Sequence, residues 1–401
     1  MSELLAVIDA NPGDAPQGLA TVVAGLTLLE RVLRLAAVCG AQRAVLVSQE
    51  PLPSLGDLFR ADPPLDIQTV SDIGDVPRNT SRIWLKASVV YERSAVRDAA
   101  SAAADLPRGE SRRQSSGHLA ITGPAPSAPA SLDEAFQAGP ATLSPGWTIQ
   151  IDSPDAVRRA TRRLWNGCRK KEDGLVARYL NRHLSLAISR AIVQLPIGPN
   201  HVSALTFALG GAAALAAAFG GYAGFLVAGL LYQINSVIDG VDGELARVRY
   251  EFSVLGEWLD TISDDLSDFL LYLGLGFGAF RTLPDAPGPF GPELWLALGV
   301  AAALGKAASM VVYYRWLRAR GRGDLLAFQW EFKDPDDEPS HLSRALSLAH
   351  YAFRKDFIVF VAMVMAIGGA LPYLLFALAP GNLIVAVSVL VQQARQGGPQ
   401  A

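Results

Sequence analysis

Four aspartates gather within residues 239–264, at the inner ends of two long apolar segments. Asp239 and Asp242 are three residues apart and Asp260 and Asp264 are four apart, so each pair shares one face of a helix. Carboxylates in a membrane span are costly, and they therefore usually face a polar cavity and bind something. Hard oxygen ligands of this kind suit Mg²⁺ or Mn²⁺, and the natural substrate for such an ion is a pyrophosphate.

The same run meets a longer pattern, D-x2-D-G-x2-A-R-x8-G-x3-D-x3-D, at every defined position. The matching residues are Asp239, Asp242, Gly243, Ala246, Arg247, Gly256, Asp260 and Asp264. The pattern resembles the signature of the CDP-alcohol phosphotransferases, membrane enzymes that move a substituted phosphate from a CDP-alcohol to a second alcohol and release CMP. The alternative is a polar kink with incidental acids, which would leave four costly carboxylates unexplained.

The resemblance implies a role for each residue of the motif. The four aspartates would bind one or two Mg²⁺ or Mn²⁺ ions across the CDP pyrophosphate, and Asp264 would also act as general base toward the acceptor hydroxyl. Gly243, Ala246 and Gly256 would be small where helices and nucleotide approach closely. Arg247 would neutralise phosphate charge as a bidentate donor.

Residues outside the motif are expected to complete the CDP site. The sequence P-N-H-V-S at 199–203 is similar to the Pro-Asn-x-x-Thr/Ser opening common in the family, which places Asn200 and Ser203 near the nucleotide. In the basic stretch before it, Arg178 or Arg182 would hold a phosphate of the substrate or acceptor. Attraction to anionic lipid headgroups explains the same positive charge equally well.

Further charged residues lie inside or beside the apolar segments. Lys306 sits in the fourth segment, at about the depth of Asp264, and we predict an ion pair with Asp265 or Asp268 because an unpaired buried charge is expensive. The alternative is a snorkelling lysine without a partner. Arg354, just before the fifth segment, is a candidate contact for a phosphate.

Hydropathy predicts the elements that position these residues. Six apolar segments follow residue 200, and most are long enough to cross a hydrocarbon core of about 30 Å. They are 201–219, 222–238, 253–279, 293–316, 356–378 and 381–394, in a six-helix domain of residues 201–395. Basic residues concentrate in the linker 244–252 and the loop 315–355, so we expect a multi-pass protein of the cytoplasmic membrane with both termini and the acidic motif in the cytosol.

Residues 1–172 predict an α/β domain with a mostly parallel sheet. Strands are predicted at 4–8, 44–47, 67–70, 83–90, 119–121 and 147–151, and a helix at 26–39. Residues 101–146 are rich in Ala, Pro, Ser and Gly, which indicates a loose, flexible excursion. Residues 173–200 include a basic amphipathic stretch, predicted to lie on the membrane as an interfacial helix.

Two pieces of this domain resemble the sugar-nucleotide-type nucleotidyltransferases. They are the helix and strand at 26–47 and the strand–Asp–helix segment W-T-I-Q-I-D-S-P-D, with Ser153 as N-cap and Pro154 at the first helical position. The loop 11–20 contains no basic residue to hold a phosphate, and the strand expected to carry a metal aspartate offers only Ala87 and Ser88. We therefore expect a degenerate domain, with a working cytidylyltransferase as the alternative.

Composition narrows the remaining choices. A net charge of −3 makes no case for nucleic acid binding. Cys39 and Cys168 lack metal or redox spacing, which fits a reducing cytosolic face. The N-terminus lacks the basic start and apolar core of a signal peptide, so the first span would act as the targeting signal.

Over most of its length the chain resembles the bifunctional cytidylyltransferase/di-inositol-phosphate phosphate synthases, through D-G-L-V-A-R-Y-L-N-R at the junction and R-K-D-F further on. This implies a membrane phosphotransferase of phospholipid or polyol-phosphodiester biosynthesis. Its donor would be a CDP-polyol or CDP-diacylglycerol, its acceptor an alcohol or phospho-alcohol, its surroundings membrane lipid, and its assembly a homodimer. A bifunctional enzyme and a non-catalytic membrane scaffold are the alternatives.

Overall fold

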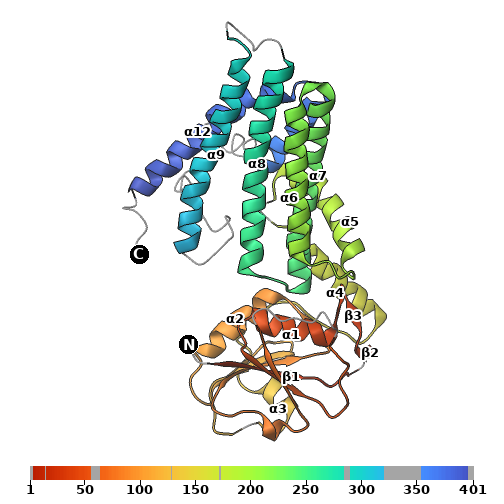
Figure 1. Ribbon diagram of the computed structural model, residues 1–401. Helices are drawn as coiled ribbons and strands as arrows, with labels where there is room; N and C mark the ends of the chain where they lie inside the picture. Colours follow the sequence, from red (N-terminus) through yellow and green to blue (C-terminus); the bar gives the residue numbers. More distant parts are fainter. Residues whose placement is uncertain are drawn as a thin grey trace, which may run out of the picture. The chain divides into compact units, whose positions relative to one another are not determined.

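The computed structural model describes residues 3–13, 15–55, 64–127, 129–170, 173–283, 290–319 and 354–395 (Figure 1). The chain divides into two compact units. The α/β unit comprises Met1–Cys168, Arg190–Pro196 and Leu245–Phe252, and the helical unit comprises Arg169–Ser189, Ile197–Glu244 and Ser253–Ala401. The last residues of two long helices thus belong to the α/β unit.

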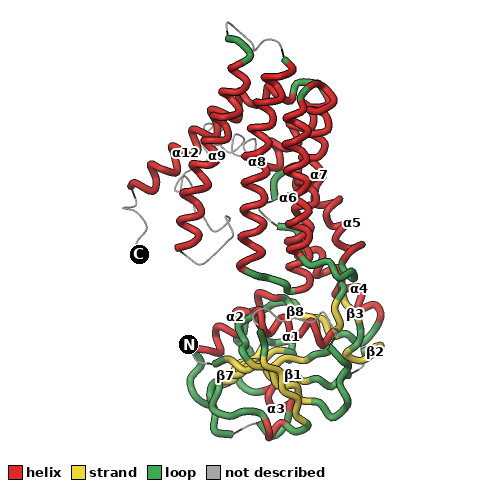
Figure 2. Tube along the Cα trace, viewed as in Figure 1, coloured by secondary structure: helices red, strands yellow, loops and turns green. Residues whose placement is uncertain are grey.

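A six-stranded sheet forms the centre of the α/β unit, in the order β6-β5-β1-β7-β10-β9 (Figure 2). Its parallel strands are β1 (Leu4–Asp9), β5 (Arg43–Val47), β6 (Asp66–Val70) and β7 (Ser81–Lys86). β10 (Leu119–Thr122) and β9 (Ser111–Arg113) extend it antiparallel. The predicted α/β class with a mostly parallel sheet is confirmed.

Alternation along the strands buries both faces of this sheet. Leu4, Ala6 and Ile8 pack with α1 (Leu28–Val38) and α2 (Arg93–Ala104), whereas Leu5 and Val7 pack with α3 (Leu132–Gln137). The predicted helix at 26–39 is present as α1, which begins two residues later, at Leu28, because the Thr27 and Glu30 side chains form a capping box there.

Smaller elements complete the α/β unit. β8 (Val89–Tyr91) pairs with β11 (Thr148–Gln150), β3 (Val22–Val23) pairs with β4 (Leu26–Thr27), and β2 (Pro16–Leu19) precedes them. α4 (Pro154–Asn166) begins with Ser153 as N-cap and a proline at N1, as predicted. A short 3₁₀ turn, η1 (Ile73–Asp75), precedes β7.

Two predictions for this unit were wrong. The run 83–90 is not one strand, because Ala87 and Ser88 form a turn between β7 and β8. The stretch 101–146 is not a loose excursion, since it holds β9, β10 and α3. Leu119, Ile121 and Phe136 are each at most 2% exposed, so buried apolar side chains anchor a stretch whose composition looks like a loop.

The helical unit contains a short π-helical turn followed by long helices. These are η2 (Ala177–Asn181), α5 (Arg182–Ile192), α6 (Pro199–Phe219), α7 (Gly221–Arg249), α8 (Val254–Thr282), α9 (Glu293–Ala319), α11 (Lys355–Ile367), η4 (Leu371–Leu374) and α12 (Leu375–Arg395). The predicted amphipathic helix before the first apolar segment is therefore present as η2 and α5.

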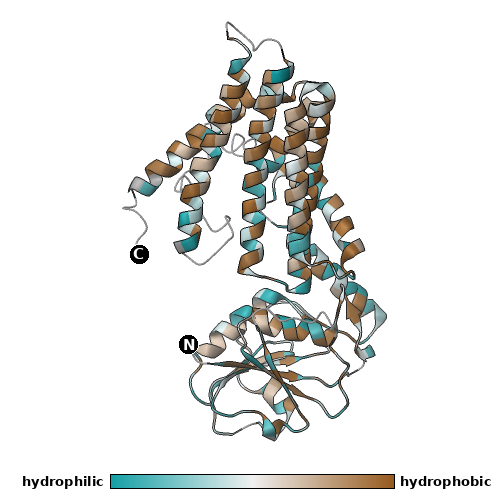
Figure 3. Cartoon of the chain, viewed as in Figure 1, coloured by the Kyte–Doolittle hydropathy of each residue, from teal (hydrophilic) through white to brown (hydrophobic). Residues whose placement is uncertain are grey.

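Four segments are long and apolar enough to cross a membrane. They are Pro199–Phe219, Gly221–Arg249, Glu293–Arg318 and Leu371–Val391. Figure 3 shows that hydrophobic residues predominate along the long helices. Large apolar side chains on these segments are exposed, among them Leu215, Phe219 and Ile384 at 67%, 72% and 66%. Exposure of this kind fits helices surrounded by lipid.

The boundary predicted between the last two apolar segments was wrong. The turn lies at residues 368–370 rather than 378–381, because Gly369 adopts a φ of +73° there. Pro380 instead lies inside α12. Most of the basic loop predicted at 315–355 lies outside the described residues.

α6 and α8 approach closely through small residues. A Cβ on Gly274 would collide with the Ala214 carbonyl group, and one on Gly278 with that of Ala217. Small residues at such positions allow helix backbones to pack tightly in a membrane. This packing fixes α8, which carries the second acid pair, against α6.

Candidate active site

The two predicted acid pairs lie on consecutive helices of the helical unit. α7 carries Asp239 and Asp242, and α8 carries Asp260 and Asp264. The carboxyl groups of Asp239 and Asp260 are close enough to share a hydrogen bond. Two carboxyl groups at this distance need a proton or a cation between them.

A set of carboxylate donors fits a hard divalent cation such as Mg²⁺ or Mn²⁺. Within the described ranges, however, no three or more His, Cys, Asp or Glu side chains are arranged to hold a metal ion. The structure therefore brings one acid of each pair together and does not gather a complete ligand set.

Asn200 and Ser203, predicted from the P-N-H-V-S sequence, lie beside the motif. The Ser203 hydroxyl donates to Asp242 Oδ2 at 2.7 Å. A Cβ on Gly256 would lie 3.0 Å from Asn200 Oδ1, so this position has little room for a side chain. Residues of α6, α7 and α8 thus meet at one place.

Asp264 has a partner that the sequence did not reveal. Lys355 Nζ, at the start of α11, lies 2.9 Å from Asp264 Oδ2 and 3.7 Å from Asp268 Oδ1. The sequence signal for this residue is its place next to Arg354 in R-K-D-F. The structure therefore adds a cation at the fourth aspartate.

The predicted ion pair of Lys306 is confirmed. Its Nζ lies 2.8 Å from Asp265 Oδ1 and 3.0 Å from Asp268 Oδ2. Tyr314 also donates to Asp265, at 2.9 Å, and Tyr232 donates to Asp268, at 2.6 Å. These partners satisfy two buried carboxylates that continue along α8 beyond the motif.

A second polar network surrounds Glu244, the residue after Gly243 of the motif. Glu244 is fully buried and accepts hydrogen bonds from Arg182 at 2.9 Å and from Ser185 and Ser189 at 2.6 Å each. Arg182 also binds Asp173 at 3.0 Å. Burial alone would raise the pKa of Asp173, but the hydrogen bonds and charge of Arg182 outweigh it and hold that pKa below its ordinary value.

This network ties α5 to the acidic helix. Arg182, predicted as a phosphate contact, binds two carboxylates of the protein itself. A Cβ on Gly240 would lie 3.1 Å from Arg182 Nη1, so a small residue on α7 admits α5. Glu244 and Gly240 are positioning residues that sequence reasoning missed, although both lie within the D-G-V-D-G-E run.

The other predicted contacts lie in different places. Arg178 is an exposed residue of η2, and Arg354 is the N-cap of α11, 3.7 Å from Asp356. Ala246 and Arg247 lie further along α7, in the part of that helix that belongs to the α/β unit. There Arg247 donates to the Cys168 carbonyl oxygen at 3.5 Å, and its Nε is buried without a hydrogen-bond partner in the described part of the chain.

At the edge of the sheet where a nucleotide would be expected, Asp9 ends β1 and Lys86 ends the neighbouring β7. After β1, Asn11 donates to Asp9, and a Cβ on Gly13 would lie 3.8 Å from both Ser88 and Gln150. The loop 11–20 has no Lys or Arg in its sequence. The loop after β1 therefore supplies no cation to hold a phosphate.

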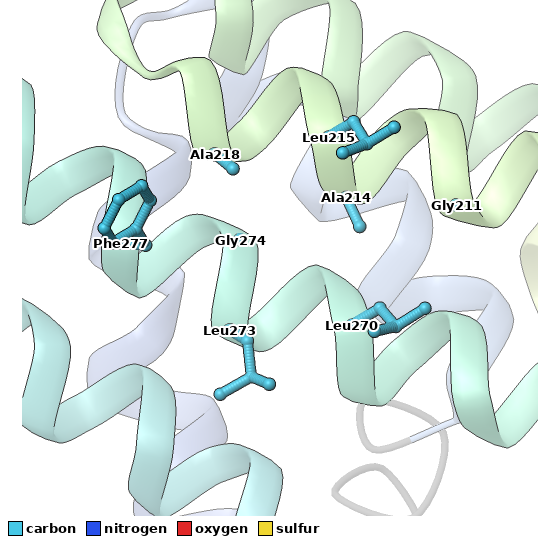
Figure 4. A pocket seen from close by; sticks show the side chains of 8 residues that line it. All are labelled: Gly211, Ala214, Leu215, Ala218, Leu270, Leu273, Gly274 and Phe277. Atoms are coloured by element: carbon cyan, nitrogen blue, oxygen red, sulfur yellow. The ribbon is translucent and has the colours of Figure 1, made fainter.

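An apolar hollow of about 420 Å³ lies on α6 and α8 (Figure 4). It is lined by Gly211, Ala214, Leu215, Ala218, Leu270, Leu273, Gly274 and Phe277. None of these side chains can donate to a phosphate or bind a metal ion. The acid pairs remain the candidate site for a diphosphate.

Comparison with known proteins supports this choice. Residues 197–331 match the family model of the CDP-alcohol phosphatidyltransferases. The bifunctional IPC transferase and DIPP synthase of Thermococcus kodakarensis is 36% identical over 179 residues, which cover 44% of this chain and 37% of that protein. The protein of the same name from Archaeoglobus fulgidus is 40% identical over 123 residues, 30% of this chain and 24% of that protein. The chain thus spans well under half the length of these relatives.

Solved structures show a weaker likeness. Mycobacterium tuberculosis phosphatidylinositol phosphate synthase (PgsA1) with CDP-DAG bound has a TM-score of 0.37 and 19% identity, covering 52% of this chain and 92% of that one. The same enzyme in complex with manganese and citrate has a TM-score of 0.37 and 18% identity, covering 51% and 87%. The part of the chain that carries the acidic motif, residues 197–331, therefore matches the CDP-alcohol phosphatidyltransferase family model.

Proposed function

We propose that this chain is a membrane CDP-alcohol phosphotransferase, which transfers a substituted phosphate from a CDP-alcohol to an acceptor hydroxyl and releases CMP. The observation that carries the proposal is the meeting of Asp239 and Asp260, from α7 and α8, inside a domain of that family. A membrane scaffold without catalytic activity would have no use for two facing acid pairs, which are expensive in this setting.

The proposed roles follow from where the acids lie. Asp239, Asp242 and Asp260, together with Asp264, would hold one or two Mg²⁺ or Mn²⁺ ions. When bound, such an ion neutralises the pyrophosphate and favours departure of CMP. Ser203 orients Asp242 through its 2.7 Å hydrogen bond.

Asp264 is the proposed general base, which accepts the proton of the acceptor hydroxyl as its oxygen attacks phosphorus. The P–O bond to CMP then breaks, and CMP leaves with the bonding electrons. Lys355, 2.9 Å from Asp264, places a positive charge beside the reacting groups. Asn200, Gly243, Ala246, Arg247 and Gly256 are proposed contacts of the CDP moiety.

The donor is proposed to be a CDP-polyol or CDP-diacylglycerol, and the acceptor an alcohol or phospho-alcohol. The relatives are named bifunctional IPC transferase and DIPP synthase, which supports a transfer reaction. We propose that the α/β unit does not make this donor, since the loop 11–20 has no cation. Release of pyrophosphate from CTP and a polyol phosphate by the purified chain would instead favour a bifunctional enzyme.

We also propose that α8 and α11 cross the membrane together with the four apolar segments, giving six crossings with the acid pairs on the cytosolic side. Lysines support this for α8, because Lys306 and Lys355 pair with three of its carboxylates within 3.0 Å. Pairing lowers the cost of charge in a span. The basic residues Arg247 and Arg249 at the end of α7 support the cytosolic orientation.

The proposal is tested by adding a panel of CDP-alcohols and acceptors to membranes that contain the chain and following release of CMP. We expect release that requires Mg²⁺ or Mn²⁺, a donor and an acceptor together. The matched control is a variant with Asp239→Asn and Asp260→Asn, which should release none. CMP release at the same rate from membranes with this variant would overturn the proposal.

A further inference from the structure

The segment that joins the two acid pairs is built into the α/β unit. We call residues Leu245–Phe252 the connector, which includes the end of α7 and the start of the link to α8. Between the last residue of α7, Arg249, and the first residue of α8, Val254, the chain has only four residues outside a helix. So short a link leaves the chain little freedom, so the contacts of the connector help to decide its direction.

Tyr250 is the most unusual residue of the connector. It has a φ of +55°, in the left-handed region that favours glycine. The Glu251 amide donates to the Ala246 carbonyl oxygen at 3.0 Å, which makes Tyr250 the C′ residue of a Schellman motif. A bulky residue here costs on the order of 1 kcal/mol in backbone strain. The tyrosine is nevertheless only 3% exposed, in the core formed by α1, α2 and the sheet.

Arginines of the α/β unit bind the connector backbone. Arg31 Nη1, from α1, donates to the Val248 carbonyl oxygen at 2.9 Å, and the Arg31 side chain is nearly fully buried. Its guanidinium also lies 5.5 Å from the centre of the Tyr250 ring. Such a buried, charge-assisted hydrogen bond holds one orientation of the helix end.

Other contacts hold the connector on both sides of Tyr250. Arg34 pairs with Glu251 at 2.5 Å, and the Arg93 guanidinium lies 3.8 Å from the centre of the Phe252 ring. Arg249 donates to the carbonyl oxygens of Val193 and Leu195, at 3.0 and 2.8 Å. Arg31, Arg34 and Arg93 thus contact the eight-residue connector, and Arg249 within it binds the chain at Val193 and Leu195.

From these contacts we propose that the α/β unit is a clamp: it fixes the connector and so sets the spacing of the two acid pairs that precede and follow it in the chain. Arg31, Arg34 and Tyr250 are then positioning residues for the transfer reaction, although none touches the substrate. The clamp rests on the proposed function. It also gives a use to an α/β unit whose loop 11–20 has no basic residue to hold a phosphate.

The first test is Tyr250→Gly in the full chain, purified in lipid nanodiscs. Glycine keeps the left-handed backbone and removes the ring, so the chain retains its favoured turn. We expect Mn²⁺ affinity, measured by electron paramagnetic resonance without donor, and kcat each to fall about tenfold, the scale of coupling changed by remote residues. The control is Arg97→Ala on α2, an exposed arginine paired with Asp98, which should change neither.

A second test does not depend on how well Tyr250→Gly folds. Arg34→Ala, Glu251→Ala and the double variant form a cycle, read on Mn²⁺ affinity and kcat with the KM for donor recorded in parallel. Residues that act through one contact are non-additive, so the double variant should lose no more than either single one. Loss of a direct contact to the donor would raise the KM for donor by more than about twofold. A KM that changes less than this would show that the residues position the acids and do not bind the donor.

The outcomes separate the clamp from the proposed function. Unchanged Mn²⁺ affinity and kcat in Tyr250→Gly and in the whole cycle would overturn the clamp, and the transferase assignment would stand. Additive losses in the cycle would also overturn it. A wild-type chain that releases no CMP would overturn the transferase assignment, and the clamp would then be decided by Mn²⁺ affinity alone.

Discussion

Asp264 differs from the other three acids of the motif in its surroundings. It is the acid that lies against a lysine, with 28% of its side chain exposed and Lys355 Nζ at 2.9 Å. Asp242, in contrast, is fixed by a serine hydroxyl. A partly exposed carboxylate beside a cation can meet an incoming hydroxyl, which is why the general base is proposed there.

Asp264→Asn should abolish turnover and leave CDP binding largely intact. The amide keeps the size of the side chain and cannot accept the proton, so kcat should fall by at least about a hundredfold, the contribution of a general base. The measurement is CMP release beside equilibrium binding of CDP. Asp98→Asn, on the exposed surface of α2, serves as the control. Normal turnover in Asp264→Asn would show that Asp264 is not the general base.

Cys39 should be unreactive in the folded chain. Burial raises the pKa of its thiol to about 12. The unfolded thiol ionises near its ordinary pKa, so this burial stabilises the fold below about pH 8.5, and the contribution declines as pH rises from there toward 12. In a Cys168→Ser background, alkylation at pH 8 should be on the order of a thousandfold slower than in urea. Equally fast alkylation in both conditions would show that the thiol is accessible and ionised.

At the scale of elements, α8 depends on lysines from other helices. Asp265 and Asp268 have side chains 8% and 5% exposed, and both bind Lys306 of α9. Uncompensated buried charges are among the most costly defects in a protein. The pairing therefore holds α8 against α9 next to the second acid pair.

Lys306→Met should lower the stability of the helical unit by about 3–5 kcal/mol, because it removes the cation of Asp265 and leaves Asp268 only Lys355, 3.7 Å away. Thermal unfolding in detergent measures the loss, with Arg97→Met on the surface of α2 as the control. Adding Asp265→Asn to Lys306→Met should recover part of the stability, since it removes a buried carboxylate that has lost its cation. An unchanged midpoint in Lys306→Met would mean that the pair contributes nothing.

The sequence predicted those elements whose signals are local. The N-cap Ser153, the apolar run of β1 and the acid spacing on α7 and α8 can all be read from neighbouring positions. Lys306 was also predictable, since a charge in an apolar segment needs a partner and few are available at its depth.

Contacts between distant segments could not be predicted. Lys355 meets Asp264 across many residues of chain, and no local pattern indicates that partner. Tyr250 looks like an ordinary linker residue until its φ of +55° and its burial are known. The turn at 368–370 was missed because Pro380 is the stronger break in sequence, and η4 and α12 accommodate it.

At the scale of the whole molecule, the chain combines an α/β unit, whose loop 11–20 has no basic residue, with a helical unit that carries the acids. The connector belongs to the first unit and links the two acid pairs of the second. The proposed clamp would give the α/β unit a role that needs no chemistry of its own. It also predicts that the two units cannot be separated between Glu244 and Ser253 without loss of metal affinity.

The central claim is that the two acid pairs together hold a divalent ion for a CDP-alcohol. The most direct measurement is Mn²⁺ binding by electron paramagnetic resonance, with and without CDP, for the wild-type chain and for Asp239→Asn with Asp260→Asn. We predict that the wild type binds one or two ions, more tightly when CDP is present, and that the double variant binds none while its helical content is unchanged. Equal Mn²⁺ binding by the two chains would contradict the account.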